Sequence, residues 1–188
     1  MRRAVLLALT TVAIAACQTG TTTGMPTASS QPPPEDLLPA FTNTIWPAIV
    51  DYNKHRSQGG PESERFHDIM DPDLKGDNAG IDGVRAYSAL RDAAQNLGQT
   101  DYDNTAKVQH SSSDITAAHS EVSSFTSNTA AVNVCYTYTH SWYRDVKDKQ
   151  QAPAASEATV ELVNVDNTWY LRAITDDHVV PSCTSGRE

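Results

Sequence analysis

The chain has 188 residues, with 14 basic and 23 acidic side chains and a net charge of −9 at pH 7. An acidic surface repels phosphate backbones, and no cluster of Lys or Arg interrupts it, so the composition argues against a nucleic-acid partner. The same charge offers nothing that would attract anionic lipid headgroups.

Residues 1–16 have the pattern of an export signal peptide. Arg2 and Arg3 give a basic start, and an uncharged run of 13 residues follows from Ala4 to Ala16. As a helix this run would be about 20 Å long, too short for a hydrocarbon core of about 30 Å, so no permanent membrane span is expected. Removing Arg2 and Arg3 leaves 12 of the 14 basic residues against 23 acidic ones, a net charge of −11.

The sequence Ile14-Ala15-Ala16-Cys17 resembles the lipobox of bacterial lipoproteins. In that family the cysteine receives a diacylglycerol, the signal is cut just before it, and the new amino terminus can be acylated. The resemblance implies a lipid anchor on Cys17 that holds the protein on the outer, extracytoplasmic face of the cell membrane. Two or three acyl chains, at about 0.8 kcal/mol per buried methylene, would hold a soluble domain firmly. The alternative is an ordinary secretory signal with an unrelated cysteine nearby.

Residues 17–35 predict a disordered tether. They are rich in Thr, Ser, Gly and Pro, and Met25 is their only sizeable apolar side chain. Such a segment cannot bury enough surface to offset its chain entropy. The remaining residues, 36–188, have the size of one domain.

The first part of this domain predicts three helices. Asp36–Arg56 has apolar residues at spacings of 3, 4 and 7, with Pro47 expected to bend or restart the helix. Glu62–Met70 predicts a short second helix, and Asp71–Gly83 an acidic loop. Val84–Leu97 predicts a third helix, ended by Gly98. The apolar face of this third helix would comprise Val84, Tyr87, Leu90, Ala94 and Leu97.

After Gly98 the apolar period changes from 3.6 to 2, which is typical of half-buried strands. Asp166-Asn167 predicts a tight hairpin turn, and Ser111–Ser113 is expected to lie in a loop. Helices followed by antiparallel strands predict an α+β fold, in which helices cover one face of a curved sheet. The expected strands are Ile115–Phe125 (bent or bulged), Val132–Trp142, Thr159–Val165 and Trp169–Ile174.

Two stretches carry a family resemblance. VELVNVDNTWYLRAI, residues 160–174, resembles the closing hairpin of the nuclear-transport-factor-2-like superfamily, whose domains are cone-shaped. VNVCYTYTHSWY, residues 132–143, and the final PSC, residues 181–183, resemble small exported lipoproteins of actinobacteria, including mycobacterial and prophage-encoded ones. The prophage resemblance implies one concrete role, interference with incoming phage. The superfamily includes both enzymes and binding domains, so the fold alone does not decide the activity.

Lipidation of Cys17 would leave Cys135 and Cys183 as an even pair in an oxidising compartment. A disulfide between them would pin the C-terminal tail across the sheet. The alternative is a reactive thiol or metal ligand, although neither residue has a CxxC partner or an adjacent His.

The acidic loop could be read as a calcium site or as solvated turns. Asp71, Asp73, Gly76, Asp77 and Asp82 fall at EF-hand positions, but Lys75 lies where a ligand belongs and Asp82 is shorter than the usual Glu. An acidic, solvated loop is therefore expected, with no metal and no cofactor.

The six histidines show no HxH or HExxH spacing. In enzymes of the resembled superfamily, an acid or a His–Asp pair inside the cone abstracts a proton, so the candidate pocket rim here is Tyr138, His140, Asp176 and His178. Asp177 and His178 lie at a strand end, where charged residues are usually only solvated, and no residue is assigned a catalytic role. We therefore expect a non-enzymatic module that binds an envelope protein or a small apolar ligand. An isomerase- or hydratase-like enzyme and a lipid carrier remain alternatives.

Overall fold

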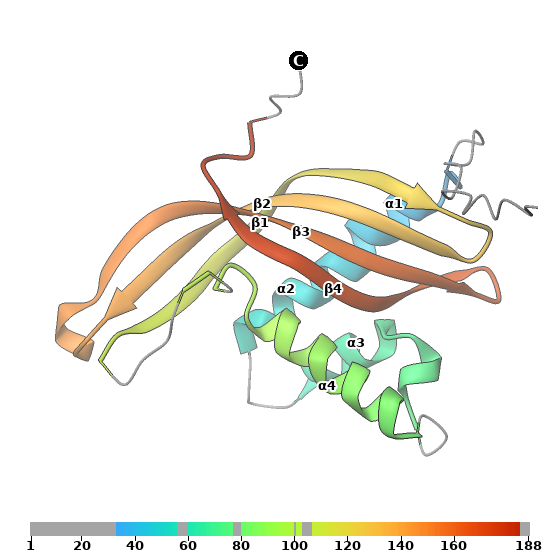
Figure 1. Ribbon diagram of the computed structural model, residues 1–188, viewed down its shortest axis with the longest axis horizontal. Helices are drawn as coiled ribbons and strands as arrows, with labels where there is room; N and C mark the ends of the chain where they lie inside the picture. The colour runs from blue at the N-terminus through green and yellow to red at the C-terminus, as the bar shows by residue number, and fades with distance from the viewer. Residues whose placement is uncertain (1–32, 56–59, 77–79, 100, 103–106, 185–188) are drawn as a thin grey trace, which may run out of the picture.

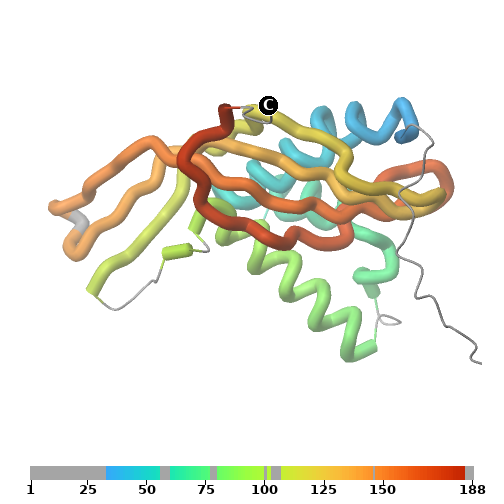
Figure 2. The backbone as a smooth tube through the Cα atoms, turned by 45° about the horizontal axis from the view of Figure 1, so that its top comes forward, coloured from blue at the N-terminus to red at the C-terminus, as the bar shows by residue number. Residues whose placement is uncertain are grey.

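The computed structural model describes residues 33–55, 60–76, 80–99, 101–102 and 107–184. Helical segments come first and four long strands follow (Figure 1). The helices lie against one face of a curved antiparallel sheet (Figure 2). The predicted α+β class is therefore confirmed. Within the described residues, every helix is too short or too polar to cross a bilayer.

The first helical segment is continuous but changes type along its length. α1 (Leu37–Ala40) leads into a π-helical turn, η1 (Phe41–Ile45), and then into α2 (Trp46–His55). Pro47 has no N–H, so the carbonyl group one turn earlier lacks its usual α-helical donor. The widened turn lies in that place, as π-bulges often do where the α-helical ladder is interrupted. The expected disturbance at Pro47 is thus a change of helix type rather than a break.

α4 (Gly80–Gln95) begins earlier than the predicted third helix. Its first turns extend beyond the sheet (Figure 1), and Val84 is 60% exposed there. The prediction of a buried Val84 was wrong because an apolar period cannot show where the supporting sheet ends. Leu90 and Ala94 do reach the core. The shorter α3 (Pro61–Ile69) matches the second predicted helix.

The four strands form one sheet in the order β1-β2-β3-β4, and each pairs antiparallel with its neighbour. Three register shifts interrupt β1, as the irregular pattern of its sequence predicted. Ser111–Ser113 belongs to β1 and pairs with β2, so the expected loop there was wrong. Polar residues occupy both faces of this edge strand, so its sequence has no alternation of apolar and polar residues that would predict a strand. The strands are β1 (Gln109–Phe125), β2 (Thr129–Tyr143), β3 (Gln150–Val165) and β4 (Thr168–Val180), and a short 3₁₀ turn, η3 (Val146–Asp148), joins β2 to β3.

The β3–β4 turn has the predicted form. Asp166 and Asn167 have φ values of 51° and 64°, which a type I′ hairpin requires at its two central residues.

The side chains on the inner face of the sheet form a packed core. The ring of Tyr136 lies 5.4 Å from that of Trp46 on the covering helix, centroid to centroid. This inward row was predicted, and its members are all buried: Val132, Val134, Tyr136, Tyr138, Trp169 and Leu171.

The acidic loop is tied to the sheet. Asp71 is fully buried, and its carboxylate accepts hydrogen bonds from Arg172 Nη1 at 3.1 Å and from the backbone N–H of Asp73 at 2.9 Å. Its own N–H donates to the carbonyl oxygen of Leu171 at 2.8 Å. The expectation of a solvated loop was therefore wrong at Asp71, because the start of the loop lies along the edge strand β4, where Met70 forms a parallel bridge with Leu171. Asp77 lies outside the described residues, among which no group of three or more His, Cys, Asp or Glu side chains could hold a metal ion.

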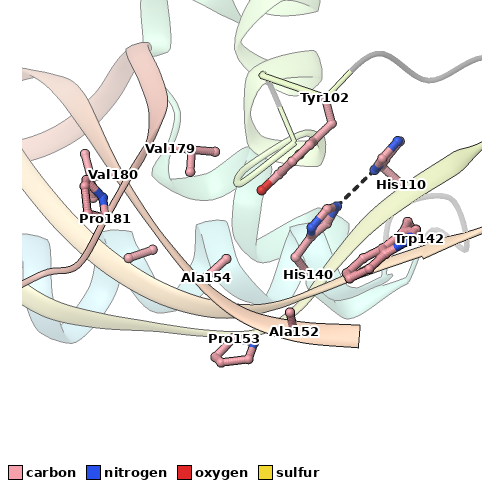
Figure 3. Close-up of a pocket in the computed structure, with 11 residues that line it drawn as sticks. Tyr102, His110, His140, Trp142, Ala152, Pro153, Ala154, Val179, Val180 and Pro181 are labelled. Carbon is pink, nitrogen blue, oxygen red and sulfur yellow. Dashed lines mark hydrogen bonds between the residues drawn. The ribbon is translucent and has the colours of Figure 1, made fainter. Parts of the chain in front are cut away.

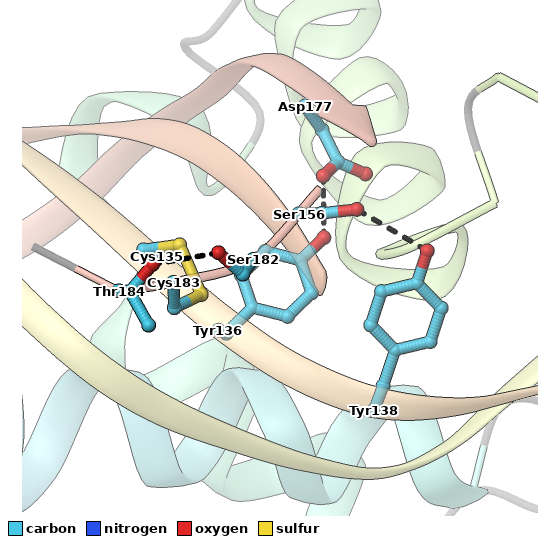
Figure 4. The surroundings of a disulfide bond; sticks show 8 residues. All are labelled: Cys135, Tyr136, Tyr138, Ser156, Asp177, Ser182, Cys183 and Thr184. Atoms are coloured by element: carbon cyan, nitrogen blue, oxygen red, sulfur yellow. Dashed lines mark hydrogen bonds between the residues drawn. A yellow bond between two sulfur atoms is a disulfide. The ribbon is translucent and has the colours of Figure 1, made fainter. Parts of the chain in front are cut away.

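The C-terminal segment is held by the predicted disulfide. Cys135 of β2 and Cys183 are bonded, with their Cα atoms 5.5 Å apart (Figure 4). The bond anchors the chain that follows β4 to the middle of β2.

Candidate functional site

A pocket forms where the sheet narrows from four strands to three. β4 pairs with β3 only as far as Val180, opposite Ala155, whereas β2 and β3 remain paired out to Trp142 and Gln150. β1, β2 and β3 continue past this step as an arm (Figures 1 and 2). The pocket at the step has a volume of about 430 Å³ (Figure 3).

One wall of the pocket is aliphatic. β3 contributes a run of small residues, Ala152–Ala155, and the end of β4 contributes Val179, Val180 and the following Pro181. Small side chains leave space beside the strand. Pro153 lies just beyond Ala155, the last β3 residue that pairs with β4. It has no N–H that could bond a further strand, and proline is common at sheet edges for this reason.

The other wall is aromatic. Tyr102, in the connection between α4 and β1, stacks on His140 of β2 with ring centroids 3.8 Å apart and planes 15° apart. It also lies parallel to His110 of β1, at 5.2 Å and 7°. Trp142 is tilted against His140 at 5.1 Å and 31°. Four aromatic rings from β1, β2 and the α4–β1 connection thus make one surface (Figure 3).

The two histidines form a hydrogen-bonded pair. His110 Nδ1 lies 3.0 Å from His140 Nε2, and the ring centroids are 5.2 Å apart with planes 10° apart. The difference between these separations is about two imidazole radii, so the two nitrogens face each other along the line between the rings. That arrangement suits an N–H···N bond rather than two lone pairs that converge on a metal ion. Burial lowers the pKa of His140, and the charge that His110 can carry lowers it further, so His140 is neutral at pH 7.

A second group of paired polar side chains lies at the edge of the core, around the half-buried Asp177. The Asp177 carboxylate accepts hydrogen bonds from the Tyr136 hydroxyl and from the Gly98 N–H, the latter at 3.0 Å. Ser156 Oγ donates to the Tyr138 hydroxyl oxygen at 3.2 Å (Figure 4). Burial raises the pKa of Tyr136, and the negative charge of Asp177 raises it further, so this phenol stays protonated.

The structure divides the predicted pocket rim. His140 lines the pocket, and Tyr138 lies buried beneath it. Asp176 and His178 are exposed on β4, which β3 separates from β2, and they line a different hollow with outward-facing residues such as Asn133. The expectation that these four residues share one rim was wrong, because β3 lies between the strand of His140 and the strand of His178.

Asp177 was expected to be merely solvated, and that was wrong. A register shift between β3 and β4 falls here, and Asp176 takes a φ of 52°, as the extra residue of a bulge can. The neighbouring Asp177 carboxylate thereby reaches Tyr136 and Gly98. Alternation along a regular strand gives no sign of such a bulge.

Three residues of the aromatic wall were not identified from the sequence as site residues: Tyr102, His110 and Trp142. Trp142 continues the period-2 pattern of β2 past His140, so it could have been included. His110 pairs across the sheet with Trp142, and finding it needed the register of β1, whose start was expected to be a loop. Tyr102 lies in a connection, and no pattern in the sequence distinguishes it.

Comparison of the sequence with protein-family models and with curated protein sequences finds no match. Among solved structures, the chain is similar to one described as a calcium/calmodulin-dependent protein kinase II association domain from Xanthomonas campestris. The two share 15% sequence identity with a TM-score of 0.38, over 82% of this chain and 94% of that one. The chain itself has N-terminal helices packed on a curved antiparallel sheet, as expected from the sequence.

Proposed function

We propose that this protein is an exported lipoprotein whose domain is a non-catalytic module that binds a small apolar ligand in the pocket at the sheet step. Cys17, the proposed lipid anchor, lies outside the described residues, and its role is inferred from the lipobox resemblance. The resemblance to prophage-encoded lipoproteins gives one setting for such a module, interference with incoming phage at the cell envelope.

The composition of the pocket wall carries the proposal. Eleven of the described residues line it, and they include aromatic, aliphatic and alanine side chains but no Asp, Glu, Lys or Arg. Pockets of this kind, mostly apolar with a few placed polar groups, are typical ligand sites. An isomerase or hydratase would need a free base beside its substrate. Here His140 Nε2 is paired with His110 Nδ1, and the Asp177 carboxylate, outside the pocket lining, accepts two hydrogen bonds.

The disulfide supports export. Cys135 and Cys183 lie at bonding distance, and such a bond persists in oxidising compartments outside the cytoplasm. It also holds the segment after β4, which includes Pro181 of the pocket wall.

The anchor can be tested by Cys17→Ser. Cells that express the wild-type chain should incorporate a fatty-acid analogue into it and retain it in the membrane fraction. The variant should take up no label, because the thiol is the acceptor. Cys183→Ser, which keeps Cys17, is the matched control and should be labelled like the wild type. Equal labelling of Cys17→Ser would refute the anchor.

The pocket can be tested with N-phenyl-1-naphthylamine, an uncharged apolar dye that fluoresces on leaving water. The mature chain should enhance its fluorescence, and Tyr102→Ala or Trp142→Ala should weaken binding at least about tenfold, the usual cost of removing a central aromatic contact. Tyr170→Ala, which removes a half-buried tyrosine outside the pocket, should leave binding unchanged. Full dye binding by both pocket variants would contradict the proposal.

A further inference from the structure

We propose that the ligand of this pocket is an uncharged, largely apolar molecule with a hydrogen-bond acceptor such as a ketone or ester carbonyl, and that Tyr102 recognises the acceptor by donating its phenolic hydrogen. This inference rests on the proposed function and names the chemical class of its ligand.

The two phenols at this site have different surroundings. Ser156 Oγ donates to the Tyr138 oxygen at 3.2 Å, and Tyr138 is buried, so this hydroxyl is held inside the protein. Tyr102 lines the pocket. A phenol has one hydrogen, which Tyr102 can donate to a group that enters the pocket.

Tyr102 is oriented so that this hydrogen serves the pocket. In Figure 3 its hydroxyl points into the space bounded by Val179, Ala154 and His140, all of which line the pocket. Its ring is held by stacking on His140. The structure thus presents the Tyr102 hydroxyl as a fixed donor on the aromatic wall, and a ligand that reaches it without an acceptor would leave the hydroxyl unsatisfied.

The surrounding charges favour a neutral ligand. In the part of the chain that the structure describes, no Lys or Arg lines the pocket to balance a carboxylate or phosphate, and the whole chain is acidic. The same described lining contains no carboxylate to balance a cation. A cation–π cage needs open ring faces around the ligand, whereas the face of Tyr102 is stacked on His140 and its hydroxyl edge points inward (Figure 3).

The experiment compares two molecules that differ by one carbonyl group. 1-Indanone and indane are titrated into the full mature chain, residues 17–188, carrying Cys17→Ala so that no lipid dissolves the probes. Binding is followed by the indole N–H signal of Trp142, assigned with Trp142→Phe. We expect 1-indanone to bind about five times more tightly than indane, the usual worth of one net hydrogen bond. Tyr102→Phe should abolish this preference and leave the affinity for indane unchanged.

Two further variants separate recognition from folding. Tyr138→Phe removes the neighbouring hydroxyl but keeps that of Tyr102, so the preference for 1-indanone should persist. Tyr170→Phe removes a hydroxyl outside the pocket and should change neither affinity.

Each contrary result has a distinct meaning. Equal affinities of the wild type for both probes would overturn the inference that the ligand carries a hydrogen-bond acceptor. The proposed binding of an apolar ligand would remain. A preference that survives Tyr102→Phe would overturn the role of Tyr102. Tighter binding of tetramethylammonium than of 1-indanone would make the pocket a cation site and overturn the inference. No binding of either probe together with no dye binding would overturn the proposed function itself.

Discussion

The body of the domain and the pocket at the sheet step use the same strand in opposite ways. In the body, the Tyr136 hydroxyl of β2 is paired with Asp177, which is in turn bonded to the end of the α4 segment at Gly98. At the step, four residues further along β2, His140 stacks on Tyr102 and lines the pocket. The Tyr136 hydroxyl in the body is thus paired within the protein, whereas the Tyr102 hydroxyl at the step points into the pocket, where a ligand can bind (Figure 3).

This difference follows from the length of β4. Where β4 is present, the sheet has four strands and the helices cover its inner face. Where β4 ends, small residues on β3 leave a hollow. Stability should therefore depend on the body and binding on the step, and the two should respond to different substitutions.

The largest effect on the body is expected from removal of the disulfide. Cys135→Ser with Cys183→Ser should lower the free energy of unfolding by about 4 kcal/mol, because the bond closes a loop with a sequence separation of 48 residues. Urea unfolding of the wild type with and without reductant, compared with the double variant, measures this. A double variant as stable as the oxidised wild type would show that the tail contributes nothing to the body.

Gly98→Ala should be the next most damaging change, and it tests the boundary between the two regions. A Cβ atom at Gly98 would lie 2.9 Å from the Tyr138 ring, and the residue has a φ of 69°. A positive φ alone costs an alanine about 1 kcal/mol, and displacing a buried ring adds to it, so we expect a loss of about 2–3 kcal/mol. Thermal unfolding measures it, with the exposed Gly76→Ala, also at positive φ but with no neighbour within 4 Å, as the matched control. Equal losses for both glycines would remove Tyr138 as the cause.

Tyr136→Phe should separate stability from binding. The Asp177 carboxylate would lose its phenolic donor, which typically costs about 1.5–3 kcal/mol for a charged acceptor. Dye binding at the step should be unchanged, because the ring remains in place. Tyr102→Phe should show the reverse pattern, with little loss of stability. If Tyr136→Phe weakened dye binding as strongly as it weakened folding, the two regions would not be independent.

The smallest effect concerns pH. The pKa of His140 is lowered in the folded protein, chiefly by burial, below the ordinary value of about 6.5 that applies to the unfolded chain. Protonation therefore favours unfolding: the contribution of neutral His140 to stability is present above about pH 6.5 and is lost as the pH falls below it. Urea unfolding between pH 7.5 and 5 should show a shallower decline for His140→Asn than for the wild type, while His67→Asn on the exposed side of α3 should decline like the wild type. Identical declines for all three chains would contradict this.

The sequence predicted the body well because its signals are periodic. The alternation from Val132 to Tyr138, the Asp166-Asn167 turn and the even pair of cysteines each depend on local pattern or simple chemistry, and the structure has all three. The step was missed because it depends on register. Nothing in the residues from Gln109 to Ser113 shows that β1 begins there and brings His110 to His140, and nothing near Asp176 shows the bulge that turns Asp177 inward. Tyr102 joins the site only through the path of the α4–β1 connection.

The three tryptophans offer the most direct test of the central claim, that ligand binding is confined to the step. Trp142 lines the pocket, whereas Trp46 and Trp169 are buried in the body. A titration of 1-indanone followed by the three indole N–H signals should shift that of Trp142 in a saturable way and leave the other two unchanged. Saturable shifts of the Trp46 or Trp169 signal, with no shift of the Trp142 signal, would place the ligand inside the body and contradict the account.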